Sequence, residues 1–340
     1  MIHASEFGFA QNGAPVTRYT LTNRRGVHAD ILTLGAALHS LVLPTAAGPV
    51  DVCLGYDTPG EYETKRSCFG ATCGRFANRI RNGRFTLGRK TYSLACNDSP
   101  NHLHGGPGGF AYRVWDVSDA LENAVVFSRV SPDGEEGYPG TLKVSVTYTL
   151  SDDDALTIRY EAVSDADTVL NLTNHTYWNL NGHASGTALR HTLRLPASFF
   201  CPCDRNRLVT GELLPVAGTP FDFTTEHTIG ERIQWPDEQL KNGIGYDHSF
   251  LLDGREPTVL SGDRSGIVLK ITTDMPAIQL YTANFLHPQS GKGGVSYAER
   301  DAVCLETQQL PDAPNNPQFP SALLKAGERF VSETRHQFFF

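Results

Sequence analysis

The feature that most constrains the fold is a strict alternation of apolar and polar residues. Between residues 142 and 150, Leu, Val and Tyr alternate with Lys, Ser and Thr, and the pattern resumes at 156–161 after the turn Ser151-Asp152-Asp153-Asp154. Successive side chains of a β-strand point to opposite faces of a sheet. The pattern therefore predicts an antiparallel hairpin with one solvated face. A second hairpin is predicted over 85–94, around the turn Gly88-Arg89-Lys90.

Frequent turn residues and the lack of long helical periodicity extend this prediction to the whole chain. There are 32 Gly and 20 Pro among the 340 residues. Further strands are predicted at 17–22, 28–34, 124–130, 191–195, 248–252, 267–272, 277–283 and 302–307, and short helical pieces at 229–234 and 320–326. Many short strands with many turns indicate an all-β sandwich or barrel.

No composition break divides the chain, so we expect one domain over residues 1–340. The Pro- and Asn-rich segment 311–320 is interpreted as an ordered loop, because too few residues follow it to form a domain. There is no fixed-period repeat, which argues against a propeller.

Composition excludes several classes of function. The net charge is −8 and charged residues make up 19% without blocks of one sign, so a nucleic-acid-binding surface is not expected. No apolar run approaches the roughly 20 residues of a membrane-spanning helix, and residues 1–7 do not resemble a signal peptide. We therefore expect a cytoplasmic protein that acts on a small neutral molecule.

The seven cysteines are expected to be reduced and mostly buried thiols. Their number is odd, their spacing is irregular, and Cys201-Pro202-Cys203 has one intervening residue instead of the two or more of zinc-binding motifs. No metal or other cofactor is predicted.

Three residues carry the groups needed for acid–base chemistry. His175 lies among amides and aromatic residues in the segment 171–180, His104 precedes Gly105-Gly106, and Glu306 interrupts the apolar run 303–308. Two imidazoles and one partly buried carboxylate are enough to move protons on both sides of a small molecule. An apolar wall and an acidic partner would hold the His175 pKa near neutrality. Aromatic rings and amides beside these groups suit a sugar.

Asp247 and the pair Asn78-Arg79 could bind hydroxyl groups of such a molecule. Each of these candidates also has a purely structural interpretation. His175 could be a core histidine, His104 a turn histidine, Asp247 a turn-initiating residue and Arg79 a surface ion-pairing residue. His102 should point away from His104 in an extended segment, and we interpret it as structural. A buried glutamate without a role is rare, so function is favoured for Glu306.

Taken together, these motifs resemble the aldose 1-epimerase family, and within it the galactose mutarotase group. The resemblance runs almost from end to end through eight segments in the family's order: 74–80, 101–106, 133–140, 174–180, 218–223, 245–248, 279–282 and 305–308.

The resemblance implies a large antiparallel β-supersandwich with few helices, a shallow sugar cleft and no cofactor. It implies Glu306 as catalytic base, His175 as catalytic acid and His104 as a second active-site histidine that stabilises charge. The residues that it implies for substrate binding are Asn78, Arg79, Asp247 and Gln279.

The expected reaction is interconversion of the α- and β-anomers of a pyranose aldose such as galactose or glucose by ring opening and closure. The alternatives are a hexose-6-phosphate epimerase on the same fold, a non-catalytic sugar-binding or sensor protein, and a glycoside hydrolase that uses Asp247 and Glu306. The sequence leaves open which aldose is preferred, whether the protein is a monomer or a homodimer, and the role of Phe338-Phe339-Phe340.

Overall fold

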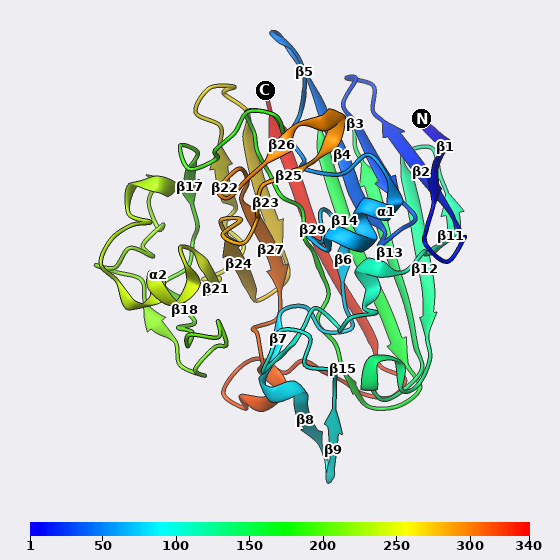
Figure 1. Cartoon of the computed structure of the whole chain (residues 1–340), viewed down its shortest axis with the longest axis vertical. Coiled ribbons are helices and arrows are strands. Elements are labelled where there is room, and N and C mark those ends of the chain that lie inside the picture. Colours follow the sequence, from blue (N-terminus) through cyan, green and yellow to red (C-terminus); the bar gives the residue numbers. More distant parts are fainter.

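Antiparallel strands make up most of the computed structural model, which describes all 340 residues (Figure 1). The largest unit is a nine-stranded sheet that contains the hairpin predicted from the alternating pattern. In spatial order its strands are β11 (Asp116–Ala120), β12 (Ala124–Ser131), β13 (Leu142–Leu150), β14 (Ala155–Ser164), β29 (Arg329–Phe339), β23 (Val268–Thr273), β22 (Thr258–Ser261), β17 (Thr192–Arg194) and β20 (His227–Thr228).

Two five-stranded sheets lie over this long sheet (Figure 1). The first consists of β1 (Ile2–Phe9), β2 (Pro15–Thr22), β3 (His28–Leu32), β4 (Ala37–Thr45) and β5 (Gly48–Asp51) in sequence order. The second has the order β19 (Leu214–Pro215), β18 (Phe199–Phe200), β21 (Asp247–Leu251), β24 (Ala277–Tyr281) and β27 (Cys304–Gln308). A core of 50 buried residues joins the inner faces of all three sheets. The expected β-supersandwich is therefore confirmed.

Short strand pairs shape the loops around these sheets. They are β7 (Arg79–Ile80) with β10 (His102–Leu103), β6 (Thr72–Cys73) with β16 (Thr173–Asn174), β8 (Arg84–Leu87) with β9 (Lys90–Ser93), β15 (Thr168–Val169) with β28 (Leu323–Leu324), and β25 (Gln289–Ser290) with β26 (Ser296–Tyr297). The β8–β9 pair is the second predicted hairpin.

Every strand range predicted from the sequence overlaps a strand of the structure, but the helices were predicted poorly. The helix expected at 320–326 is wrong: this segment contains β28, whose Leu324 is buried when it pairs with Thr168 of β15. At 229–234 there is only the 3-10 turn Ile229–Glu231. In both places, hydrogen bonds to distant segments set the backbone conformation instead of local helix propensity.

The α-helices of the structure are α1 (Pro59–Lys65) and α2 (Glu238–Gly243). Both helices are too short to show a helical period of apolar residues, but the residues at their N-termini are typical of helix starts. Pro59 occupies the first turn of α1, where it costs no hydrogen bond. The Asp237 carboxylate caps α2 by accepting hydrogen bonds from the Gln239 and Leu240 amides at 2.7 and 3.2 Å. No helix of the structure combines the length and the apolar composition needed to cross a membrane.

The C-terminal phenylalanines have a structural explanation. Phe338 and Phe339 are the last two residues of β29, which lies in the interior of the nine-stranded sheet between β14 and β23. Phe338 is 2% exposed and its ring lies 5.8 Å from that of Trp178, whereas Phe339 points outward and is 45% exposed. The ammonium of Lys270 lies 4.8 Å from the Phe339 ring.

This difference predicts unequal effects of truncating two adjacent phenylalanines. Phe338→Ala should lower the free energy of unfolding by about 3–5 kcal/mol, because it leaves a cavity in the core. Phe339→Ala, the matched control, should cost roughly 1 kcal/mol or less, because its ring is half exposed. Urea denaturation of both variants at 25 °C measures the difference, and equal losses would contradict the placement of β29.

Candidate active site

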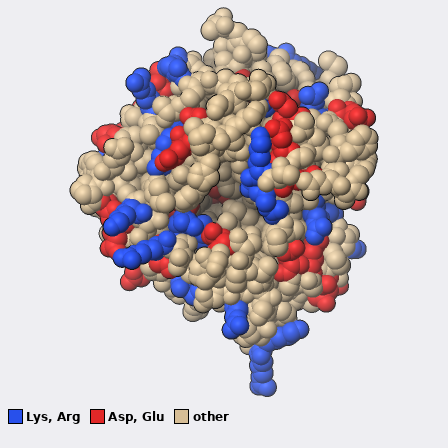
Figure 2. All heavy atoms as spheres, in the orientation of Figure 1, with Lys and Arg blue, Asp and Glu red and all other residues tan.

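A cavity of about 240 Å³ lies above the second five-stranded sheet, on the face turned away from the core. All seven residues predicted from the sequence as catalytic or substrate-binding line it. Figure 2 shows a hollow near the centre of this face, bordered by uncharged side chains together with Lys, Arg, Asp and Glu side chains. Its volume is slightly below the roughly 300–1,000 Å³ of pockets for drug-sized ligands, which suits a single small molecule.

The register of three strands places the carboxylates and the amide. Gln279 of β24 stands opposite Glu306 of β27 and opposite Ser249 of β21, and Asp247 lies two residues before Ser249. With a side-chain period of two, Asp247, Gln279 and Glu306 all project from the same face. The intervening residues, among them Ile278 and Leu305, point into the core. This explains how polar side chains alternate with apolar ones in segments that are buried on both faces.

A chain of contacts fixes the binding residues before any ligand enters. The Gln279 side-chain amide donates to Asp247 Oδ1 at 2.7 Å, and the Arg79 guanidinium lies 3.9 Å from Asp247 Oδ2. Arg79 Nε also donates to Asp98 at 2.7 Å. Gln279 Oε1 is buried and has no hydrogen-bond partner in the protein, so it is available to a ligand donor.

The backbone of Asn78, immediately before β7, determines which nitrogen of His104 carries the hydrogen. The Asn78 amide donates to His104 Nδ1 at 3.1 Å, and the His104 amide donates to the Asn78 carbonyl at 3.1 Å. Burial lowers the pKa of His104 well below its usual value, so its ring is neutral at pH 7. A neutral imidazole that accepts through Nδ1 carries its hydrogen on Nε2. His104 therefore presents a hydrogen-bond donor to the cavity.

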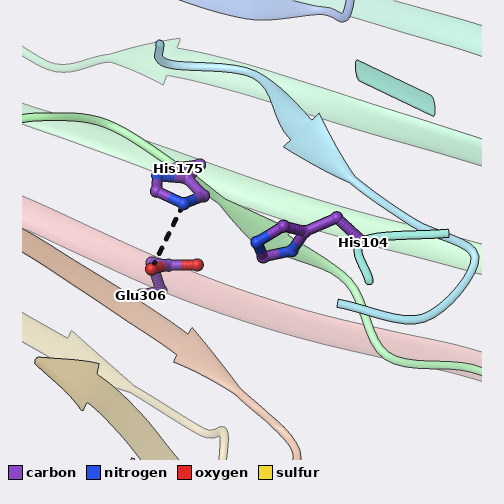
Figure 3. A group of neighbouring side chains, drawn as sticks. All are labelled: His104, His175 and Glu306. Carbon is purple, nitrogen blue, oxygen red and sulfur yellow. Dashed lines mark ion pairs between the residues drawn. The ribbon is translucent and has the colours of Figure 1, made fainter. Parts of the chain in front are cut away.

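His175 and Glu306 meet at the base of the cavity (Figure 3). His175 follows β16 and Glu306 lies on β27, and the two side chains approach to 3.6 Å between Nε2 and Oε1. The His104 ring lies 5.2 Å from that of His175 and approaches from a third segment. Tyr177 stacks on the His175 ring at 5.1 Å. His175 Nδ1 and Glu306 Oε2 are buried without a partner.

Burial pushes both groups of this pair toward their neutral forms. It lowers the pKa of His175 from 6.5 to about 4, so the prediction of an imidazole titrating near neutrality is wrong for the empty site. Burial, with a smaller contribution from the Asp247 charge, raises the pKa of Glu306 well above its usual value. Loss of hydration outweighs the attraction between the partners. Burial therefore favours a neutral imidazole beside a neutral carboxylic acid over an ion pair.

The same three side chains bring two imidazole nitrogens and one carboxylate within 4.8 Å of one another, as in some metal sites. The tautomer of His104 does not fit metal binding. Ligation through Nε2 would move its hydrogen to Nδ1, where it would face the Asn78 N–H. The arrangement suits hydrogen bonds to oxygen atoms better than a cation.

Several lining residues were not predicted from the sequence. Tyr281 lies two residues after Gln279 and so shares its face of β24. The alternation along this strand could have predicted that Tyr281 lines the cavity, but it was not used in that way. Asp98, which anchors Arg79, gave no signal in its turn-like segment. Lys65, the last residue of α1, and the loop residues Arg66, Cys68 and Phe285 also line the cavity, and only the fold brings them there. His102 is confirmed as structural: it is buried and bonds Tyr138 Oη and the Ala95 carbonyl, both at 2.7 Å.

The family profile described as aldose 1-epimerase matches residues 17–337. The chain belongs to the aldose 1-epimerase family. It is 42% identical over 336 residues to the galactose mutarotase of Sus scrofa, covering 97% of this chain and 96% of that protein. It is 37% identical over 338 residues to the aldose 1-epimerase of Escherichia coli K12, covering 97% of each.

Solved structures agree with this assignment. The crystal structure of galactose 1-epimerase from Lactobacillus acidophilus NCFM superposes with a TM-score of 0.88 at 30% identity, covering 100% of this chain and 98% of that one. The resemblance to the aldose 1-epimerase family that the eight sequence segments indicated is thus confirmed along the whole chain.

The pKa of His175 predicts a measurable effect of pH on stability. Its folded-state pKa of about 4 lies below the ordinary 6.5. The unfolded chain therefore takes up this proton first, and the stabilisation present above pH 6.5 is lost as the pH falls toward 4. Between pH 7 and pH 5 the wild-type protein should lose about 2 kcal/mol more stability than His175→Gln. Urea denaturation at both pH values measures this, with the surface variant His3→Gln as control; identical pH dependences of wild type and His175→Gln would contradict it.

Proposed function

We propose that this protein interconverts the α- and β-anomers of a neutral pyranose aldose, with Glu306 and His175 as the proton-transfer pair. The observation that carries the proposal is their 3.6 Å approach at the base of a cavity whose walls offer hydroxyl-binding groups. Family membership supports the reaction, and the geometry supports the residue roles.

Anomer exchange requires one proton to leave the C1 hydroxyl and one to reach the ring oxygen. Glu306 accepts the C1 hydroxyl proton and His175 donates a proton to the ring oxygen. The bond between C1 and the ring oxygen breaks, and an open-chain aldehyde forms. Rotation about C1–C2 presents the other face of the carbonyl. The steps then reverse: His175 takes back the proton as the C5 hydroxyl attacks, and Glu306 returns one to the C1 oxygen.

The electrostatics of the empty site fit this cycle without any net proton uptake. A neutral imidazole with a carboxylic acid holds the same single proton as an imidazolium with a carboxylate. Substrate hydroxyls can hydrogen-bond the unpartnered Glu306 Oε2 and so replace the hydration that burial removed. Binding the sugar thereby shifts the proton from Glu306 to His175 and prepares the reactive state. The neutral His104 donor is placed to stabilise charge on oxygen during opening.

Binding of the remaining hydroxyls falls to Asn78, Arg79, Asp247 and Gln279. These residues are already connected to one another, so little side-chain entropy is lost when the sugar binds. Asp247 accepts hydroxyl hydrogens, Arg79 donates, and the amides do both.

A phosphorylated substrate fits less well. The cationic residues of the cavity are Lys65, Arg66 and Arg79, and each already has partners. Lys65 Nζ lies 2.8 Å from Glu61, Arg66 donates to the Pro107 carbonyl at 2.7 Å, and Arg79 bonds Asp98. A phosphate would have to break these contacts. A purely sugar-binding protein would not need an acid and a base in contact.

We also propose a single domain over residues 1–340. Strands from both halves of the chain, such as β14 and β29, are neighbours in one sheet, and the active site draws residues from positions 78 to 306.

Removing either proton-transfer group should abolish most catalysis. Glu306→Gln should lower kcat about 10²–10⁴-fold, and His175→Asn should do the same, because each removes one positioned proton transfer. Gln has the shape of the neutral carboxylic acid that burial favours, so the fold should survive. Polarimetry of freshly dissolved α-galactose and α-glucose measures the rate, with the exposed Glu299→Gln as control. Near-wild-type rates in either variant would refute the roles.

Asp247→Asn should act mainly on binding. It keeps the shape but weakens the acceptor for substrate hydroxyls and turns a donor toward the Gln279 amide. KM should rise about 10-fold or more, with a smaller change in kcat. Initial rates across a range of aldose concentrations separate the two constants, and a large fall in kcat at unchanged KM would show that Asp247 does more than anchor the sugar.

A further inference from the structure

No hydrogen bond to another residue orients the imidazole ring of His175. Its Nδ1 is buried without a partner, and its Nε2 lies 3.6 Å from Glu306 Oε1, which is longer than a good hydrogen bond. A histidine that transfers protons is usually fixed by a carboxylate or a carbonyl that accepts from its second nitrogen. The His175 ring has no such partner, so its orientation depends on packing.

Aromatic rings provide that packing. The Tyr177 ring lies nearly parallel to the His175 ring, with 5.1 Å between the centroids and 13° between the planes. The Tyr281 and His104 rings meet it steeply instead, at 84° and 71°. In the parallel arrangement the two faces meet, so Tyr177 presents the face of its π system to the imidazole.

The path of the chain explains this contact. Tyr177 follows His175 by two residues, a spacing that places both side chains on the same side of an extended segment. The Leu54 amide donates to the Tyr177 carbonyl at 3.0 Å, and Trp178 exchanges two backbone hydrogen bonds of 2.9 Å with Val303. The backbone around Tyr177 is thus held from both sides by segments that are distant in sequence.

The Tyr177 side chain is itself confined and uncharged. It is 5% exposed, and the rings of Phe69 and Tyr281 meet it nearly at right angles, with 4.7 and 6.0 Å between centroids. Burial raises the pKa of its hydroxyl well above the usual value, so the side chain stays a neutral phenol. What it offers His175 is therefore the face of its ring, where the aromatic quadrupole is negative.

A ring face in this position favours the charged form of His175. In the proposed cycle His175 becomes an imidazolium before it protonates the ring oxygen of the sugar, whereas burial lowers its pKa to about 4. A cation within about 6 Å of the centroid of a tyrosine ring is attracted by the ring quadrupole. This attraction appears when the imidazole gains its proton and disappears when the proton is given away. A carboxylate at Nδ1 would also favour the imidazolium, but its charge would oppose ionisation of Glu306.

We propose that Tyr177 is a positioning residue for His175: its ring fixes the orientation of the imidazole and stabilises the imidazolium that donates to the sugar. The inference rests on the proposed role of His175 as the catalytic acid. It requires no contact between Tyr177 and the sugar, so the effect of Tyr177 belongs in kcat and not in KM.

Two substitutions test the requirement for a ring at position 177. Tyr177→Phe keeps the ring and its face, and kcat should stay within about threefold of wild type. Tyr177→Leu removes the ring but keeps an apolar side chain. Its kcat should fall about 10-fold, the effect of losing a cation–π contact of ordinary strength, with KM changed less than about threefold. Polarimetry of freshly dissolved α-galactose and α-glucose over a range of concentrations separates the two constants.

Tyr297→Leu is the matched control for lost packing. Tyr297 is a fully buried tyrosine of the same apolar cluster, and its ring packs against those of Phe69 and His183 and not against that of His175. Its kcat should remain within about twofold of wild type. Equal falls in kcat for the two leucine variants, or equally low kcat in Tyr177→Phe and Tyr177→Leu, would overturn the inference. Wild-type kcat in Tyr177→Leu, with or without a rise in KM, would overturn it as well.

A series that conserves the shape of the ring covers the case in which Tyr177→Leu does not fold. Phenylalanine analogues with one, two or three ring fluorine atoms are incorporated at position 177, because fluorine withdraws electron density from the ring face at nearly constant size. The value of kcat should fall with each fluorine, by roughly threefold or more over the series, as the attraction for a cation weakens. A kcat that does not depend on fluorination would overturn the stabilisation of the imidazolium. A wild-type protein that is inactive on every aldose would instead refute the proposed function.

Discussion

The register between β21, β24 and β27 is the constraint on which the site depends. These strands lie between two layers, with apolar residues such as Leu305 in the core on one face and Gln279 and Glu306 in the cavity on the other. A slip of one residue would exchange the faces, burying charge in the core and exposing apolar side chains to the ligand. Stability and function therefore select the same pairing, and the hydrogen bond from Gln279 to Asp247 ties two of the strands together on the cavity side.

Much of this was predictable from the sequence, for physical reasons that differ between regions. The β13–β14 hairpin followed from its alternation, because one of its faces is solvated. In β27 both faces are buried, so its pattern does not distinguish a core face from a solvated one, and only the unusual Glu306 within an apolar run indicated a function. Motifs identified the seven residues that line the cavity, whereas the distances between their side chains come from the fold alone. Cys68 and Phe285 were missed because loop positions depend on tertiary contacts and leave no local pattern.

The electrostatics of the site could not be derived from residue types alone. The sequence indicated an acid and a base, and the structure adds that burial shifts the pKa values of both groups toward their uncharged forms. This arrangement limits side reactions in the empty site, because burial disfavours both an imidazolium and a free carboxylate there. It also explains why a neutral, hydroxyl-rich ligand suits the cavity better than an ionic one, which would meet residues whose charges are already paired.

The position of β29 has a consequence for folding during synthesis. It is the last strand in chain order, yet it lies between β14 and β23 and joins the two parts of the long sheet. Until β29 has emerged from the ribosome, β14 and β23 each have an unpaired edge with free N–H and C=O groups. Such edges attract other strands. The largest sheet therefore remains incomplete until β29 has been synthesised and can pair, so binding of a chaperone to the two open edges would govern how much of the protein reaches the native state.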